Sequence, residues 1–151
     1  MSVYAINKRA RSDYQLLETY EAGLKLTGPE VKSVKMGGLR LVGAYVTIHA
    51  GQMQLLNAHI SRYKPAGPMP EYDPARSRPL LLKKRELREI IGQMHQKGLT
   101  LVPIRAYSKR NLIKLEFAVA RGKRQYEKRD VLRKREAQRT IARALRSRPA
   151  R

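Results

Sequence analysis

The chain of 151 residues contains no cysteine, no tryptophan and a single phenylalanine. Without cysteine it can form no disulfide, and it offers neither a thiol nucleophile nor thiolate ligands for a metal ion. No segment approaches the roughly 18 apolar residues that a membrane-spanning helix requires. The first six residues, MSVYAI, lack the basic-then-apolar pattern of a secretory signal, so we expect a cytoplasmic protein with no membrane partner.

Acidic residues are also scarce, and their distribution argues against catalysis. Twelve Asp and Glu are scattered along the chain, whereas a metal-dependent nuclease needs a cluster of carboxylates. The three histidines, His49, His59 and His95, stand far apart with no His-x-His or Glu-x-x-His pairing. Neither a nucleophile-elbow nor a phosphate-loop motif occurs. The sequence therefore predicts no enzyme, no metal site and no cofactor.

Basic residues are in large excess and are concentrated at one end. The net charge is +21, and residues 121–151 hold thirteen Lys and Arg against three Asp and Glu. Such a basic extension on a basic body is typical of a protein that binds a polyanion. Nucleic acid is the expected partner, because each Lys or Arg placed near a phosphate releases a condensed counterion.

The alternation of apolar and polar residues predicts a mainly β domain. Strands are expected over 13–26 (with a break or bulge at Gly23), 44–50, 53–60, 99–107 and 112–120. A short helix is expected to begin at Gly28-Pro29-Glu30 and to end at Gly37-Gly38. A second helix is expected over 82–97, where it would plug or cap an open end of a barrel, and the proline-rich residues 61–79 are expected to form a long loop that pairs with no strand.

Strands of similar length without a βαβ repeat favour an OB-like closed β-barrel with two or three short helices. We expect residues 1–120 to form this RNA-binding barrel and residues 121–151 to form a basic tail. The tail is rich in helix-forming residues, but Arg135, Arg139 and Arg143 repel one another at i, i+4 spacing. We therefore predict a tail that is disordered when free and becomes helical on a polyanion.

Five strings resemble one protein family, and they occur in that family's order. They are Asn7–Ala10, Tyr20–Val34, Asn57–Ile60, Asp73–Arg78 with Leu80–Leu82, and Ala118–Arg129. The family is SmpB (small protein B, or SsrA-binding protein), which binds tmRNA. The departures do not remove any string: Pro79 replaces a usual Lys, Glu127 replaces a usual Asp, and residues 41–44 are more apolar than usual.

This resemblance implies a non-catalytic protein of trans-translation with an OB-like fold. Its members bind the tRNA-like domain of tmRNA and deliver it to ribosomes that have stalled without a stop codon. Their tail folds as a helix in the decoding region and the empty mRNA channel of the small subunit. The implied partners are tmRNA, the ribosome, elongation factor Tu and alanyl-tRNA synthetase, and we expect a monomer.

The expected tmRNA-binding residues of the body are of three kinds. Asn7, Lys8 and Arg9 would reach RNA from a flexible arm, or else form a solvated N-terminus. Glu21 would accept hydrogen bonds from base amino groups or ribose hydroxyls, or else pair with a neighbouring Lys or Arg. The remaining residues would form a basic surface or ordinary solvated faces: Lys32, Lys35, Lys109, Arg110 and Lys114. Leu81 is expected in the core.

The expected residues of the tail resemble the family segment that enters the decoding region. They are Gly122, Lys123, Arg124, Tyr126, Lys128, Arg129, Arg133, Lys134 and Arg135. Tyr126 would stack on a ribosomal base, or else anchor the tail on the barrel. Two other classes remain open from the residues: a general RNA-binding or ribosomal OB-fold protein, and an enzyme such as a nuclease, which the scattered carboxylates disfavour.

Overall fold

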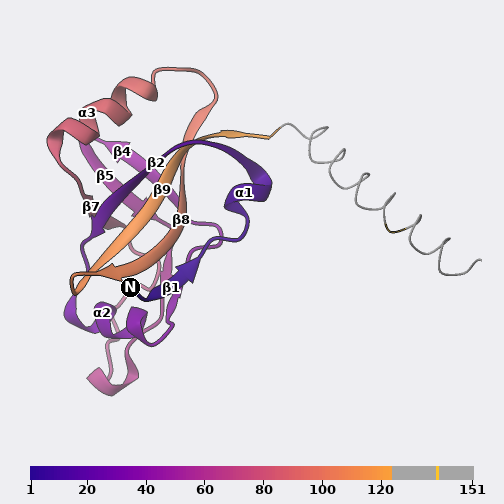
Figure 1. The fold of residues 1–151 in the computed structure, drawn as a ribbon. Coiled ribbons are helices and arrows are strands. Elements are labelled where there is room, and N and C mark those ends of the chain that lie inside the picture. Colours follow the sequence, from indigo (N-terminus) through magenta and orange to yellow (C-terminus); the bar gives the residue numbers. More distant parts are fainter. Residues whose placement is uncertain (124–138, 140–151) are drawn as a thin grey trace, which may run out of the picture.

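The structure, a computed structural model, describes residues 1–123 and Arg139. Within this part the fold is mainly β with three short α-helices, which confirms the expected class (Figure 1). In chain order the elements are β1 (Val3–Ile6), α1 (Ala10–Asp13), β2 (Tyr14–Leu24), α2 (Gly28–Lys35), β3 (Leu39–Arg40), β4 (Tyr45–His49), β5 (Gln52–Leu56), β6 (His59–Ile60), a 3-10 turn (Lys64–Ala66), β7 (Arg78–Leu81), α3 (Lys84–Gln93), β8 (Leu99–Lys109) and β9 (Leu112–Gly122).

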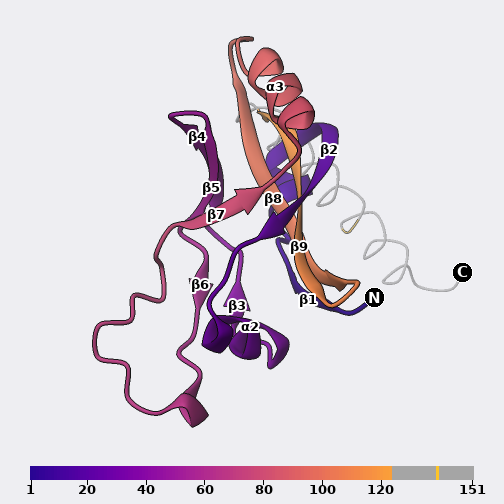
Figure 2. The same ribbon diagram turned by 90° about the vertical axis from the view of Figure 1, so that its left-hand side faces the viewer.

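The main sheet has seven antiparallel strands in the order β1-β8-β4-β5-β7-β2-β9, and β8 also pairs with β9. The long ladders join β9 to both β2 and β8, with Tyr20 opposite Phe117 and Leu101 opposite Val119. The short strands β3 and β6 form a separate two-stranded sheet. Figure 2 shows α3 at one end of the molecule and α2 with the loop before β7 at the opposite end.

The period-two pattern of the sequence determines which side chains enter the core. Along β9, Ile113, Leu115, Phe117 and Val119 are all buried, because alternate residues of a strand point to the same face. Ile90 of α3 is fully buried in the same cluster. Helix α3 therefore forms where the sequence predicts a helix and packs on the core through Ile90, although it is shorter than the predicted 82–97.

The N-terminal segment is ordered, which corrects the expected flexible arm. Strand β1 pairs with β8, with Val3 opposite Tyr107. The Asn7 backbone N–H donates to the Ile104 carbonyl at 2.7 Å, and its side-chain amide donates to the Pro103 carbonyl at 2.9 Å. Asn7 is buried by these contacts. The sequence did not reveal this, because the pairing partner lies about a hundred residues away.

Strand β7 begins inside the region that was expected to be loop, because its first two residues are Arg78 and Pro79. It pairs with β5 and β2, with Gln54 opposite Pro79 and Gly23 opposite Leu81. Pro79 is compatible with a ladder here because it contributes its carbonyl, which accepts from Lys25 N–H at 3.1 Å. The alternation turns Leu80 inward and leaves Leu81 59% exposed, so the expectation that Leu81 lies in the core is wrong.

Three other predicted boundaries also differ. Strand β5 ends at Leu56, whereas the predicted strand ran from 53 to 60. The backbone turns at Asn57, which adopts a φ of 61°, and His59 and Ile60 pair with β3 instead. The irregularity in β2 falls between Leu16 and Glu18, not at Gly23. Strand β9 continues past Ala120 to Gly122.

Helix α2 begins and ends close to the predicted residues. Thr27 and Glu30 form a capping box, in which each side chain bonds the other's backbone N–H. The helix ends at Lys35, and the chain then turns sharply through Gly37-Gly38. A Cβ on Gly38 would lie 2.2 Å from the Ser33 hydroxyl, so this close approach requires glycine.

A buried ion network joins α2 to β7 and to the loop that precedes β7. Glu30 is paired with Arg76 and Arg78, and Arg78 Nη2 lies 2.7 Å from the carboxylate. Arg78, which is 0% exposed, also donates to the Ala58 carbonyl at 2.6 Å. The Tyr72 hydroxyl donates to the Ile60 carbonyl at 2.8 Å and lies 3.3 Å from Glu30. From the sequence alone, Glu30 is expected only in the first turn of a helix, without these partners.

The charge state of Glu30 depends on this network. Burial alone would raise the pKa of Glu30, but hydrogen bonds from Arg76, from the Thr27 backbone and from Arg78 outweigh it and lower the pKa to about 2. The ordinary value is 4.5. A carboxylate with a depressed pKa stabilises the fold at pH above its unfolded value, and that stabilisation is lost as pH falls through the folded value.

We predict that Glu30→Gln lowers the free energy of unfolding by about 3 kcal/mol at pH 7, because it leaves two arginines without their carboxylate. The difference in free energy of unfolding between the variant and wild type should become smaller as pH falls from about 5 to about 2, since Glu30 of wild type becomes protonated over this range. Urea unfolding at a series of pH values measures both effects.

Glu71→Gln is the matched control, because this exposed residue of the same loop undergoes the same change of charge. It should alter the free energy of unfolding by less than about 0.5 kcal/mol. A Glu30→Gln variant as stable as this control, or a difference independent of pH, would show that the network does not stabilise the fold.

Candidate nucleic-acid interface

The described candidate residues fall into two groups on the surface. The first, called here the hairpin-end surface, comprises Glu21, Lys32, Lys35, Lys109, Arg110 and Lys114. Lys109 and Arg110 lie at the β8–β9 turn, and Figures 1 and 2 place α2, which carries Lys32 and Lys35, at the same end. The second, called here the arm–exit surface, comprises Lys8, Arg9 and Lys123, near α1 and the end of β9.

Glu21 stands within a cluster of hydrogen bonds on the hairpin-end surface. Its carboxylate accepts from the Tyr107 hydroxyl and from Lys109 Nζ at 3.4 Å. The pairing with a neighbouring lysine, which the sequence left open, is therefore present. The side chain of Glu21 remains 34% exposed, so its carboxylate is also accessible from solvent.

The electrostatics of this cluster keep Glu21 ionised. The hydrogen bond from Tyr107 is the main cause that lowers the pKa of Glu21, and the charges of Lys109 and Lys114 add to it against the effect of burial. Burial and the adjacent Glu21 raise the pKa of Tyr107, so its hydroxyl stays protonated and available as a donor. Tyr107 could not be recognised from the sequence, because nothing there distinguishes it from the other residues of the predicted strand 99–107.

The Tyr107 ring also contacts a cation. The Arg105 guanidinium lies 4.9 Å from the ring centroid, and the same side chain forms an ion pair with Glu116 at 3.4 Å. On α2, Lys32 Nζ lies 5.7 Å from the ring centroid of Tyr63. These cation–π contacts restrain two basic side chains of this end of the molecule.

The arm–exit surface is formed where the two ends of the folded region meet. Lys123 N–H donates to the Asp13 carbonyl at 3.0 Å, and Lys123 Nζ donates to the Arg11 carbonyl at 3.1 Å. Gly122 stands opposite Tyr14 in the β2–β9 ladder. Lys8 and Arg9 are exposed beside this junction, whereas Asn7 is buried and holds the segment in place.

The other candidates of the tail lie outside the described residues. They are Arg124, Tyr126, Lys128, Arg129, Arg133, Lys134 and Arg135.

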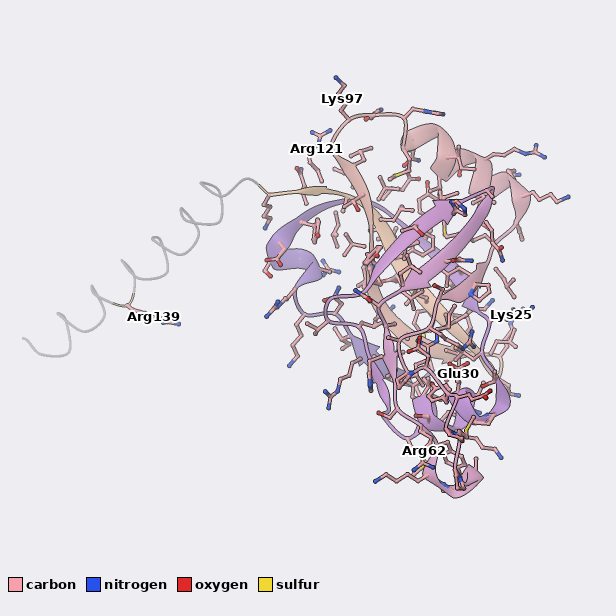
Figure 3. The ribbon with its side chains drawn as sticks, turned by 180° about the vertical axis from the view of Figure 1, so that it is seen from behind. Lys25, Glu30, Arg62, Lys97, Arg121 and Arg139 are labelled. Atoms are coloured by element: carbon pink, nitrogen blue, oxygen red, sulfur yellow. The ribbon has the colours of Figure 1, made fainter. Side chains whose placement is uncertain are left out.

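Figure 3 shows further basic side chains at both ends of the folded region: Arg62 lies at the α2 end, and Lys97 and Arg121 lie at the opposite end.

The described residues offer neither a metal-binding cluster nor a membrane-spanning helix. Residues 1–123 and Arg139 contain no group of three or more His, Cys, Asp or Glu side chains placed to hold a metal ion. In the same part of the chain, no helix has the length and apolar character needed to cross a membrane.

Fold and surface together are those of a small, strongly basic β protein, and comparison with known proteins identifies the family. The family model described as SmpB protein matches residues 4–147. The SsrA-binding protein of Rubrobacter xylanophilus is 47% identical over 148 residues, which cover 98% of each chain. The SsrA-binding protein of Nostoc punctiforme is 45% identical over 145 residues, or 96% of this chain and 94% of the relative. The chain therefore belongs to the SmpB protein family.

A solved structure is also similar to this fold. It is described as "tmRNA-SmpB: a journey to the center of the bacterial ribosome", and it superposes with a TM-score of 0.66 at 42% sequence identity. The match covers 85% of this chain and 93% of the solved one. The similarity therefore extends over most of the folded region.

We predict that Tyr107→Phe raises the pKa of Glu21 toward its ordinary value, because the main hydrogen bond that favours the carboxylate is lost. Titration of the Glu21 carboxyl carbon by NMR measures the change. Tyr63→Phe, which removes a hydroxyl that is not among the hydrogen-bond donors to Glu21, is the control and should leave that pKa unchanged. An equal pKa in wild type and Tyr107→Phe would mean that the lysines alone control Glu21.

Proposed function

We propose that the protein binds the tRNA-like domain of tmRNA and delivers it to ribosomes that have stalled without a stop codon. The observation that carries this proposal is the family match over residues 4–147, together with the 42% identical solved neighbour that its description places with tmRNA and the ribosome. The protein acts in the cytoplasm as a non-catalytic monomer. Elongation factor Tu and alanyl-tRNA synthetase are its further partners.

The body acts as a preformed RNA-binding unit of the OB-like barrel type. Strand β8 pairs with β4 as well as with β9, and the remaining pairings run through β5, β7 and β2, which supports a closed barrel. Lys32, Lys35, Lys109, Arg110 and Lys114 approach RNA phosphates. Glu21 accepts from a base amino group or a ribose hydroxyl, which phosphate-directed lysines cannot do.

The tail acts on the ribosome rather than on tmRNA. Beyond the junction at Gly122 and Lys123, the segment with Arg124, Tyr126, Lys128 and Arg129 enters the decoding region. The segment with Arg133, Lys134 and Arg135 continues as a helix into the empty mRNA channel. Ribosomal phosphates there cancel the repulsion between like charges that opposes this helix in free solution.

Competition binding at near-physiological salt tests the RNA preference. We expect the full-length protein to prefer the tRNA-like domain of tmRNA over a duplex RNA of equal charge by roughly a hundred-fold or more, because charge alone does not distinguish them. An ordinary tRNA serves as the control of similar shape. Equal binding to all three RNAs would favour a general RNA-binding protein instead.

Truncation tests the division between body and tail. Because Lys123 is hydrogen-bonded to α1, the chain is best shortened after this residue rather than after Ala120. The shortened protein should bind the tRNA-like domain within a few fold of wild type and should fail to support tagging of stalled chains in a reconstituted translation system. Loss of binding to the tRNA-like domain would show that the tail belongs to the tmRNA interface.

A further inference from the structure

A cavity of about 380 Å³ opens on the arm–exit surface, between α1, the start of β2, the turn before β4 and the start of β8. Arg9, Tyr14, Gly43, Tyr45 and Thr100 are among its lining residues. Tyr14 stands opposite Gly122, so the cavity adjoins the point where the tail leaves the body. Figure 1 shows α1 on the same side of the molecule as the end of β9.

The lining combines the groups that a single nucleotide requires. Two tyrosine rings line the cavity: Tyr45 is 44% exposed, so its ring is accessible to a base, and Tyr14 is half-buried against Ala10, Val102 and Ala120. Arg9 is an exposed cation for a phosphate.

The backbone at Gly43 leaves room for a ligand. Gly43 adopts a φ of 83°, and no atom lies within 4 Å of the position that a Cβ would occupy. The side of Gly43 that a side chain would occupy is therefore open to a ligand. The volume of the cavity also falls within the range of roughly 300–1,000 Å³ that is common for small-ligand sites.

We propose that this cavity receives one unstacked nucleotide of the bound RNA, with its base against Tyr45 and Tyr14 and its phosphate beside Arg9. The occupant is single-stranded, because a base that remains stacked and paired in a duplex cannot present its face to these rings. The inference rests on the proposed function, since the RNA that the protein binds supplies the nucleotide. It adds a base-reading site, next to the tail, to the phosphate contacts of the basic surfaces.

Two probes and three variants of the full-length protein test the proposal. The probes are a short unstructured RNA and a blunt duplex RNA of equal charge, both at near-physiological salt. Tyr45→Ala should weaken binding to the unstructured RNA by roughly ten-fold, because a stacking face is lost, and should change binding to the duplex by less than about two-fold. Tyr45→Phe keeps the ring and should bind both probes as wild type does.

Tyr63→Ala is the matched control, because it removes another tyrosine ring that lies beside Lys32 and away from the cavity. It should not distinguish the two probes. Photocrosslinking of wild type to an unstructured RNA that contains 4-thiouridine gives an independent readout, and the adduct should map to residues that line the cavity. This readout holds even if Tyr45→Ala proves unstable.

Equal effects of Tyr45→Ala on both probes, no effect on either, or crosslinks confined to other surfaces would overturn the proposal. These outcomes are distinct from failure of the proposed function. If wild type prefers the tRNA-like domain of tmRNA but Tyr45→Ala behaves as wild type, only the nucleotide site is wrong. If wild type shows no preference for that domain yet Tyr45→Ala still separates the two probes, the site stands as part of a general RNA-binding protein.

Discussion

The pairing of Glu30 with two arginines is the interaction on which one end of the molecule depends. Glu30 and Arg78 are almost completely buried, and removing such charges from water is unfavourable unless each is paired and hydrogen-bonded. The described residues meet this condition, because none of their buried side-chain nitrogen or oxygen atoms lacks a partner. The network joins α2, the proline-rich loop and β7, and it adds to the contacts that Val34 and Leu80 make with the apolar core. Lys32 and Lys35 therefore lie on a helix whose position is fixed by the ion pairs of Glu30 with Arg76 and Arg78.

Strand β9 connects the two surfaces that carry the candidate RNA contacts. Lys114 lies near its start, beside the hairpin end, and Lys123 follows its last residue, beside α1. Nine residues of extended strand separate them, which corresponds to about 30 Å. A ligand that engages both surfaces at once must be large and must keep its shape over this distance, as a folded RNA does. The ladders of β9 with β2 and β8 make the spacing rigid.

Local patterns in the sequence were sufficient to predict most of the elements. The alternation along residues 112–120 identified β9, and the helical spacing of apolar residues within 82–97 identified α3, because strand and helix periods appear directly in sequence. Pro29 and Gly38 marked the ends of α2 for backbone reasons that do not depend on the rest of the fold. The excess of Lys and Arg indicated a polyanion as partner, since net charge is a property of composition. The family strings then narrowed the expectation to tmRNA.

Features that depend on contacts between distant residues could not be predicted from local sequence patterns. Asn7 is buried because it meets β8 about a hundred residues later, and Leu81 is exposed because strand register, not apolarity, decides which face a side chain takes. Glu30 and Arg78 form a pair across 48 residues, and Tyr107 meets Glu21 across 86. The cavity with Tyr14 and Tyr45 exists only because three strands and α1 converge there. Sequence alone determined the elements, their hydrophobic faces and the basic character of the chain. Tertiary structure alone decided which charges are buried and paired and which aromatic rings remain available, because those outcomes depend on contacts between residues far apart in the chain.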